Sequence, residues 1–462
     1  GVGAVIRRAV ALVLAVGLIA GLAPVVAAAA TATFGTPTAK STFGTGIVFT
    51  QPVTFSGAIG RVELLLTIAD AIGPEVVDLP GAPGAGATTL TYTLDTSGAA
   101  NMIPNTPIVA RWRVSAAGDP AAVSLGPEVR LVYADDRFTW KSASSALVRV
   151  HWYQGDAAFG AKALRLGEDE VRATSKLLGV TETSPVDFFV YATVAEFYGA
   201  IGAGAHENVA GSAYPEIRTM LGLIPPDQID DPQVAVRIPH EFVHLVFDTA
   251  SRNPYHAPPR WLNEGLAVYQ SEGYGGTDRA LVGDAAANGT LIPLAGLVGQ
   301  FPNGNDFFLA YAESVAALDF MIRTYTRDAL VKLVRSYAGG RTDDEAFKDA
   351  LGVDTTAFAA AWFASVRATP KQRFGPQPAP PGPVPSAWLG AAAVGSATPA
   401  SPGPTATSTG TTQASPATGG GGGAAGDTGS GWLAFLVVAA LIVLIGGVAV
   451  ARRRRLASPP AS

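Results

Sequence analysis

Two histidines and a glutamate form the clearest chemical motif of the sequence. His240, Glu241 and His244 stand in the segment HEFVH at 240–244. Residues four apart on an α-helix lie on one face, so the two imidazoles can bind one metal ion. This spacing is typical of zinc sites in which the intervening glutamate acts as the general base toward a water at the metal. HExxH also occurs in proteins that bind no metal, so a third ligand must decide between the two interpretations.

Glu264 is the candidate for that third ligand. It belongs to the segment WLNEG at 261–265, and nineteen residues separate it from His244. Catalytic zinc sites use three protein ligands and leave one position for water, and two histidines with one glutamate are a standard set. Taken alone, Glu264 would be a solvated acid on a helix surface. After HExxH, and among apolar neighbours, it predicts a zinc ligand.

The sequence contains no cysteine, which limits the kind of metal site that it can build. Disulfides and thiolate ligands are excluded, so a metal must be held by His, Asp or Glu. The expected cofactor is therefore Zn²⁺ bound by His240, His244 and Glu264. The net charge of -5 leaves no basic surface for nucleic acid, so we expect no nucleic-acid partner.

HEFVH followed by WLNEG resembles the gluzincin metallopeptidases. WLNEG is similar to the second motif of the aminopeptidase N-like family, and the bacterial peptidase MA-like domain family is the closer overall resemblance, over roughly residues 150–368. The resemblance implies a zincin-like core and a peptide or protein substrate. It also implies that His240, His244 and Glu264 bind zinc and that Glu241 is the catalytic acid/base.

Tyr311 is a further candidate that the resemblance suggests. Aminopeptidase N-like enzymes have a tyrosine at the start of a comparable helix, where it stabilises the oxyanion. In this sequence Glu313 and Ser314 replace the Lys-Gly that usually follows, so the similarity is partial. The alternative is a tyrosine of the core or of the cleft rim.

Two acidic residues complete the set of candidates. Glu207, in GAHEN at 204–208, resembles the GAMEN motif, in which a glutamate binds the α-amine of the substrate; the alternative is a loop acid. Asp248 follows His244 by one helical turn and could accept a hydrogen bond from a ligand imidazole. Solvation at the helix end is the alternative for Asp248.

The elements that must position these residues suggest an α+β fold. Residues 31–150 contain short β-type runs separated by Gly and Pro, which predict a small β-sandwich. Residues 151–369 form the predicted peptidase MA-like domain, with a strand at 186–191 and mostly helical patterns after it. Helices are expected at 161–178, 194–201, 239–248, 259–269, 305–325, 327–337, 343–351 and 354–366.

The two ends of the chain predict secretion and membrane attachment. Residues 1–30 combine Arg7 and Arg8 with an apolar run and small residues, as in a signal peptide; a retained N-terminal anchor is the alternative. Residues 432–451 are long and apolar enough for one transmembrane helix, and the arginines of the tail 452–462 mark its cytoplasmic side. A cell-wall sorting signal has a similar layout, but no LPxTG motif precedes this segment.

Residues 370–431 are rich in Pro, Ala, Gly, Ser and Thr. Such a segment buries too little apolar surface to offset the entropy of ordering, so it predicts a disordered stalk. Together these features predict a single-pass membrane protein whose N-terminal domains lie outside the cytoplasm.

Three functions remain open at this stage. The first is a membrane-anchored zinc metallopeptidase with Glu241 as general base. The second is a catalytically inactive zincin-fold protein that serves as a surface binding or adhesion protein. The third is a zinc hydrolase that acts on a bond other than a peptide bond.

Overall fold

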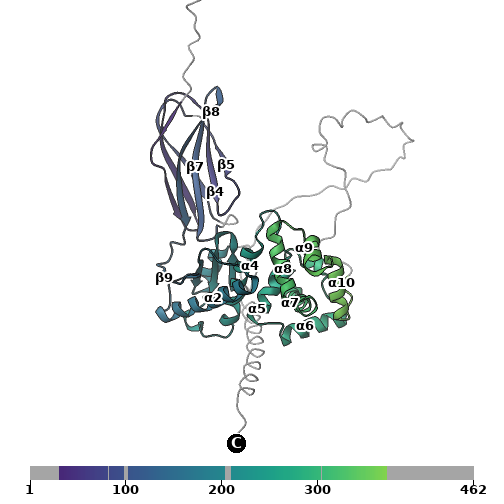
Figure 1. The fold of residues 1–462 in the computed structure, drawn as a ribbon. Helices are drawn as coiled ribbons and strands as arrows, with labels where there is room; N and C mark the ends of the chain where they lie inside the picture. Colours follow the sequence, from purple (N-terminus) through teal and green to yellow (C-terminus); the bar gives the residue numbers. More distant parts are fainter. Residues whose placement is uncertain (1–30, 82, 98–101, 203–209, 303, 372–462) are drawn as a thin grey trace, which may run out of the picture. The chain divides into compact units, whose positions relative to one another are not determined.

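The computed structural model describes residues 31–81, 83–97, 102–202, 210–302 and 304–371 (Figure 1). Glu207 lies outside these ranges, as do the predicted signal peptide, transmembrane helix and basic tail and nearly all of the predicted stalk. Within the described ranges, no helix is both long and apolar enough to cross a membrane. The predictions for the two ends of the chain therefore stay predictions.

The first eight strands form two antiparallel sheets that share one hydrophobic core. One sheet has the order β1-β3-β2, with β6 also pairing with β3, and the other has the order β5-β4-β7-β8. Side chains such as Phe49 of β3, Leu64 of β4 and Trp112 of β7 are fully buried in the common core. The strands are β1 (Ala32–Phe34), β2 (Thr38–Thr42), β3 (Gly46–Phe55), β4 (Ile59–Ile68), β5 (Glu75–Leu79), β6 (Gly86–Asp95), β7 (Thr106–Ala116) and β8 (Asp119–Tyr133).

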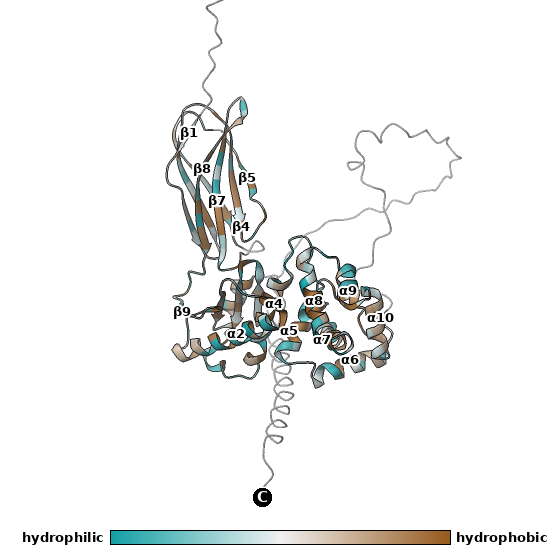
Figure 2. Cartoon of the chain, in the orientation of Figure 1, coloured by the Kyte–Doolittle hydropathy of each residue, from teal (hydrophilic) through white to brown (hydrophobic). Residues whose placement is uncertain are grey.

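Hydrophobic and hydrophilic residues are interspersed along these strands (Figure 2). In β7, every second residue from Thr106 to Ala116 is buried, which is the pattern of a strand with one face on a core. The residues between them include Arg111 and Arg113 on the other face. The region therefore consists of two sheets packed face to face.

A third sheet has the order β12-β13-β11-β10-β9. Its three central strands are parallel, and β9 and β12 are antiparallel strands at its edges. β9 precedes the predicted domain boundary after residue 150, whereas β10 spans it and pairs with β11, so the sheet crosses that boundary. The strands are β9 (Lys141–Ser144), β10 (Val148–Trp152), β11 (Val186–Tyr191), β12 (Gly211–Tyr214) and β13 (Thr219–Leu223).

Helices make up most of the chain after this sheet, so the predicted mixture of strands and helices is confirmed. The predicted bounds of α3, α7 and α9 agree with the structure, whereas α6 was not predicted. The helices are α2 (Ala157–Leu178), α3 (Val194–Ile201), α4 (Val234–Ser251), α5 (Arg260–Ser271), α6 (Gly276–Asn288), α7 (Asn305–Tyr325), α8 (Arg327–Ser336), α9 (Asp343–Leu351) and α10 (Thr355–Ser365).

The start of α4 differs from the sequence prediction. We expect Pro239 in the first helical turn, but the helix begins at Val234 and Pro239 lies inside it. The proline leaves the carbonyl of Ala235 without its helical donor. Val234 and Ile238, four residues apart, are both buried in the core. The burial of these two side chains offsets the lost hydrogen bond. Capping residues in the sequence do not indicate this earlier start of the helix.

Close packing on both sides of α4 and α5 fixes the elements that carry the candidate site. Gly167 of α2 lies so close to the ring of Phe242 of α4 that a Cβ at this glycine would be 2.5 Å from a ring carbon. Gly265 of α5 faces α7 in the same way, since its Cβ would lie 2.6 Å from the carbonyl oxygen of Ser314. The two glycines therefore allow the backbones of the site helices to approach their neighbours.

Candidate active site

Three predicted zinc ligands from two helices converge. Glu264 Oε2 of α5 lies 3.4 Å from His240 Nε2 and 3.5 Å from His244 Nε2 of α4. One ligand atom from each residue lies within 4.8 Å of the others. Within the part of the chain that the structure describes, this is the only group of three or more His, Asp or Glu side chains so arranged.

The geometry of this group fits a tetrahedral zinc ion. Ligand atoms about 2.0–2.2 Å from one tetrahedral ion lie roughly 3.3–3.6 Å from one another, which matches the two measured separations. Glu264 Oε2 is buried and has no hydrogen-bond partner among the described residues. A buried carboxylate oxygen without a partner is costly, and a cation held between the three atoms would remove that cost.

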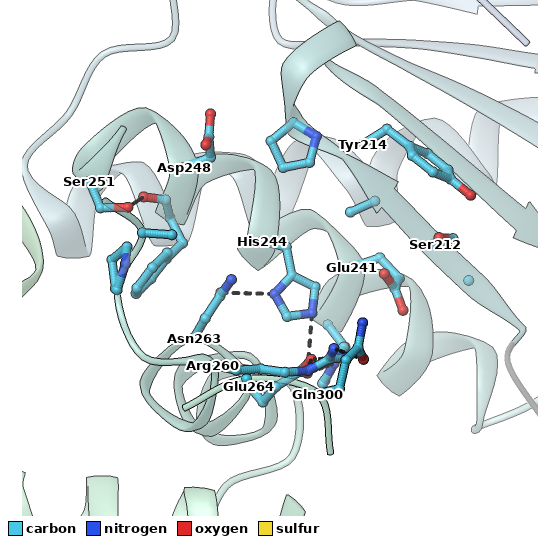
Figure 3. Close-up of a pocket in the computed structure, with 18 of the residues that line it drawn as sticks. Ser212, Tyr214, Glu241, His244, Asp248, Ser251, Arg260, Asn263, Glu264 and Gln300 are labelled. Atoms are coloured by element: carbon cyan, nitrogen blue, oxygen red, sulfur yellow. Dashed lines mark hydrogen bonds and ion pairs between the residues drawn. The ribbon is translucent and has the colours of Figure 1, made fainter. Parts of the chain in front are cut away.

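His244 is held in one orientation by Asn263. The distance between His244 Nδ1 and Asn263 Oδ1 is 2.8 Å (Figure 3). An amide oxygen can only accept, so Nδ1 carries the proton and Nε2 offers its lone pair toward Glu264. Hydrogen bonds of this kind fix the tautomer of histidine ligands in metal sites. Asn263 takes the role that the sequence suggested for Asp248.

Glu241 lies in the same cleft, against β12. A Cβ at Gly211 would lie 2.6 Å from its Cγ, and both residues line the cleft. Burial, opposed by the charge of His244 and assisted by the Glu264 carboxylate, raises the pKa of Glu241 to about 7. A carboxylate with such a pKa is suited to take up and release a proton near neutral pH.

The charges around Glu264 lower its pKa, in contrast to the raised pKa of Glu241. Burial works against its ionisation, yet the nearby His244, His240 and Arg260 together hold the pKa of Glu264 at about 2. The two glutamates of the cleft are thus set apart by their surroundings. Glu264 stays ionised as a ligand should, and Glu241 is the one that can exchange a proton.

Tyr311 of α7 also lines the cleft, and its ring centroid lies 6.3 Å from that of His240. Phe301 and Phe307 enclose the ring, with centroid distances of 5.2 Å each. Burial, and then the charge of Glu264, raise the pKa of Tyr311 far above its usual range. The hydroxyl therefore keeps its proton and can donate it in a hydrogen bond.

Glu313, two residues further on, has no part in the cleft. Its side chain is fully buried and accepts the backbone N–H of Ile292 at 2.9 Å. At this position the aminopeptidase N-like motif has a lysine. In this chain the glutamate links α7 to the segment around Ile292.

The cleft has a volume of about 850 Å³ and is lined by α4, α5, β12, Tyr311 and the segment 298–300. Asp248 lines it one turn beyond His244, and burial raises the pKa of Asp248 to about 6. The contact of Asp248 within α4 is with Arg252, at 3.6 Å. Glu207 lies outside the described residues, so its predicted role stays a prediction.

The sequence assigns no role to Asn263 or Arg260 and predicts no strand at β12. Asn263 belongs to the WLNEG motif and Arg260 directly precedes it, so both lie within about one helical turn of Glu264. The edge strand β12 has only four residues, of which Gly211, Ser212 and Ala213 give little strand signal. Its place at the cleft depends on pairing with β13, which the sequence pattern does not reveal.

Comparison with known proteins supports the resemblance seen in the motifs. Residues 168–368 match the family model described as the Peptidase MA superfamily, and this region contains His240, Glu241, His244 and Glu264. No curated protein matches the chain.

Solved structures of metallopeptidases are similar at low identity. An aminopeptidase N family protein from Idiomarina loihiensis is 10% identical, with 72% of this chain and 75% of that chain covered and a TM-score of 0.38. An M1 zinc metallopeptidase from Deinococcus radiodurans is 12% identical, with 73% and 92% covered and a TM-score of 0.35. A mutant M1 zinc metallopeptidase from the same organism, bound to a Tyr-Ser-Ala substrate, is 12% identical, with 73% and 92% covered and a TM-score of 0.34.

Proposed function

Because residues 168–368 belong to the Peptidase MA superfamily, we propose that this chain is a zinc metallopeptidase that hydrolyses peptide bonds with Glu241 as general base. One observation carries the proposal. Three side chains that suit zinc meet in a cleft, one of their oxygens is buried without a hydrogen bond, and a carboxylate with a raised pKa lies beside them.

The roles of the residues follow from their places in the cleft. Zinc held by His240, His244 and Glu264 would supply a Lewis acid and lower the pKa of a coordinated water toward about 7. Glu241 takes the proton of the attacking water and passes it to the nitrogen of the leaving amine. Tyr311 donates a hydrogen bond to the oxygen of the scissile carbonyl as negative charge develops there.

The second part of the proposal concerns location. The apolar segments 1–30 and 432–451 and the arginines that follow the second support a protein anchored by one C-terminal helix, with its N-terminal regions outside the cytoplasm. We also propose that the chain is divided into a β-sandwich at 31–150, a peptidase domain at 151–369 and a stalk at 370–431. Protease added to intact cells should remove a tag inserted after residue 30, behind the predicted signal peptide, and leave a C-terminal tag; loss of both tags, or of neither, would contradict this orientation.

The test of activity is mass spectrometry of a mixed peptide library after incubation with the zinc-loaded full-length chain. The control is Glu241→Gln, which keeps the size of the side chain but removes the base. We expect cleavage by the wild type and a loss of about 10²–10⁴-fold in rate in the variant, with the zinc content unchanged.

Each outcome has a distinct meaning. Cleavage by the wild type alone supports the peptidase, and the cut positions report endo- or exopeptidase action. Zinc bound without any cleavage would favour the surface binding protein, and cleavage of other bonds only would favour a different hydrolase. Loss of zinc from Glu241→Gln would indicate that Glu241 is itself a ligand.

A further inference from the structure

Arg260 is the first residue of α5 and lies one helical turn before Glu264 (Figure 3). Its backbone N–H donates to the carbonyl of Val298 at 2.9 Å, and its guanidinium lies 5.1 Å from the ring centroid of Phe301. Nη1 donates to Gln300 Oε1 at 2.9 Å. These contacts hold the side chain against the segment that borders the cleft, so the guanidinium has a fixed position.

The guanidinium engages only one of the two oxygens of Glu264. Nε and Nη2 each lie 3.1 Å from Oε1, whereas Oε2 has no hydrogen bond and faces the two imidazoles. The terminal torsion of a glutamate is broad, so a free carboxylate could present either oxygen to a metal. Two donors on Oε1 remove that freedom and leave Oε2 as the ligand atom.

Arg260 and Tyr311 line the same cleft, and the positive charge of Arg260 opposes the rise that burial causes in the pKa of the tyrosine hydroxyl. One arginine thus acts on both the predicted third ligand and the predicted oxyanion donor.

We propose that Arg260 is a positioning residue that fixes Glu264 with Oε2 toward the metal site. The inference rests on the proposed function only in that the site binds a metal ion. A competing role is direct contact with a substrate carboxylate. The side chain of Arg260 is 32% exposed, and it is the only Lys or Arg among the described residues that line the cleft.

Zinc affinity of the full-length chain separates these roles without any substrate. The variants are Arg260→Gln and Arg260→Lys, and the dissociation constant is measured by competition with a chelator. We expect Arg260→Gln to bind zinc about 10–100-fold more weakly, as is usual when a partner of a metal ligand is lost. Arg260→Lys keeps one donor for Oε1 but loses the paired donors of the guanidinium. Its zinc affinity should therefore lie between those of Arg260→Gln and the wild type.

A matched control is Arg279→Gln. Arg279 of α6 also lies over an aromatic ring, 4.0 Å from the centroid of Tyr274, but it does not line the cleft. The zinc affinity of Arg279→Gln should equal that of the wild type. Should Arg260→Gln fail to fold, as judged by thermal melting, Arg260→Lys decides alone, and a folded Arg260→Lys with wild-type zinc affinity and kcat would overturn the proposal.

Kinetics on the peptides cleaved by the wild type provide the second measurement. Positioning predicts that Arg260→Gln lowers kcat on neutral and acidic peptides alike at saturating zinc, with partial recovery in Arg260→Lys. Unchanged zinc affinity together with a higher KM only for acidic peptides, or only for peptides with a free C-terminal carboxylate, would identify Arg260 as a substrate contact instead. A wild type that binds zinc but cleaves nothing refutes the proposed function, and the zinc affinities still decide the role toward Glu264.

Discussion

A buried glutamate stands in the double-sheet region and another in the cleft, and they differ in how their charge is balanced. Glu63 of β4 is 5% exposed, and its two oxygens contact Arg113 and, at 3.1 Å, Arg61. The hydrogen bond from Arg113 lowers the pKa of Glu63 although burial opposes it. Glu63 Oε1 and Glu264 Oε2 are both buried without a hydrogen bond among the described residues, but Glu63 Oε1 is paired with the Arg61 guanidinium, whereas in Glu264 only Oε1 contacts an arginine.

The difference shows how a structural acid and a ligand acid can be told apart. In the double-sheet region, two arginines of the protein balance the charge of the Glu63 carboxylate, so no bound ion is needed for stability. In the cleft one oxygen and two imidazole nitrogens are left facing one another, which is stable only when a cation joins them. The following predictions test this contrast, from the largest expected effect to the smallest.

Removal of each glutamate should have different results. Glu264→Ala should release zinc completely after dialysis, because two imidazoles alone leave the site open, and cleavage should be lost with it. Glu63→Ala should keep both the bound zinc and the peptide cleavage. Its Tm should shift by no more than about 4 °C, because the arginine partners of Glu63 are partly exposed. Elemental analysis and thermal melting measure the two effects. Full zinc content in Glu264→Ala would remove this residue from the ligand set.

Tyr311→Phe removes a single hydroxyl from the cleft. If the hydroxyl stabilises the developing oxyanion, kcat should fall by about 10²–10³-fold while the zinc content stays the same. Tyr325→Phe is the matched control, since Tyr325 ends the same helix and packs on Phe320 and Phe358. Equal kcat values for the wild type and Tyr311→Phe would place this tyrosine in the cleft wall without a catalytic role.

Glu313 provides a third kind of buried acid, one that is kept neutral. Burial raises the pKa of Glu313 from 4.5 to about 8, against the hydrogen bond from the backbone of Ile292. The folded protein therefore holds this proton more tightly than the unfolded chain. Its stabilising contribution is complete below about pH 4.5 and is lost as the pH rises to about 8.

Glu313→Gln keeps an acceptor for Ile292 and removes the ionisation. Urea unfolding between pH 4.5 and 8 should show the wild type losing a few kcal/mol more than the variant, since each pKa unit corresponds to about 1.4 kcal/mol. Parallel curves for the two proteins would show that the Glu313 side chain titrates normally in the folded state.

The sequence predicted those parts of the site that depend on short-range spacing. His240, Glu241 and His244 share one face of one helix, so the periodicity of that helix is enough to bring them together. Glu264 was predicted to join them because a catalytic zinc site needs a third protein ligand, although the path of the turn between the two helices could not be predicted from the sequence. Asn263 and Arg260 were missed since their roles depend on which face of α5 looks toward α4. β12 was missed since a short edge strand gains its stability from pairing and not from its own residues.

The smallest predicted effect concerns Gly265, which follows Glu264. The added Cβ of Gly265→Ala would lie 2.6 Å from the Ser314 carbonyl, so α5 must move away from α7. We expect a loss of about 1–3 kcal/mol in the free energy of unfolding and a several-fold weaker binding of zinc, because Glu264 moves with the helix. Gly283→Ala in α6 is the control, since its Cβ meets nothing within 4 Å, and it should be neutral or stabilising. Weaker zinc binding in Gly265→Ala alone would tie the geometry of the ligand to the contact between α5 and α7, whereas equal zinc affinities would show that Glu264 adjusts independently of the helix that carries it.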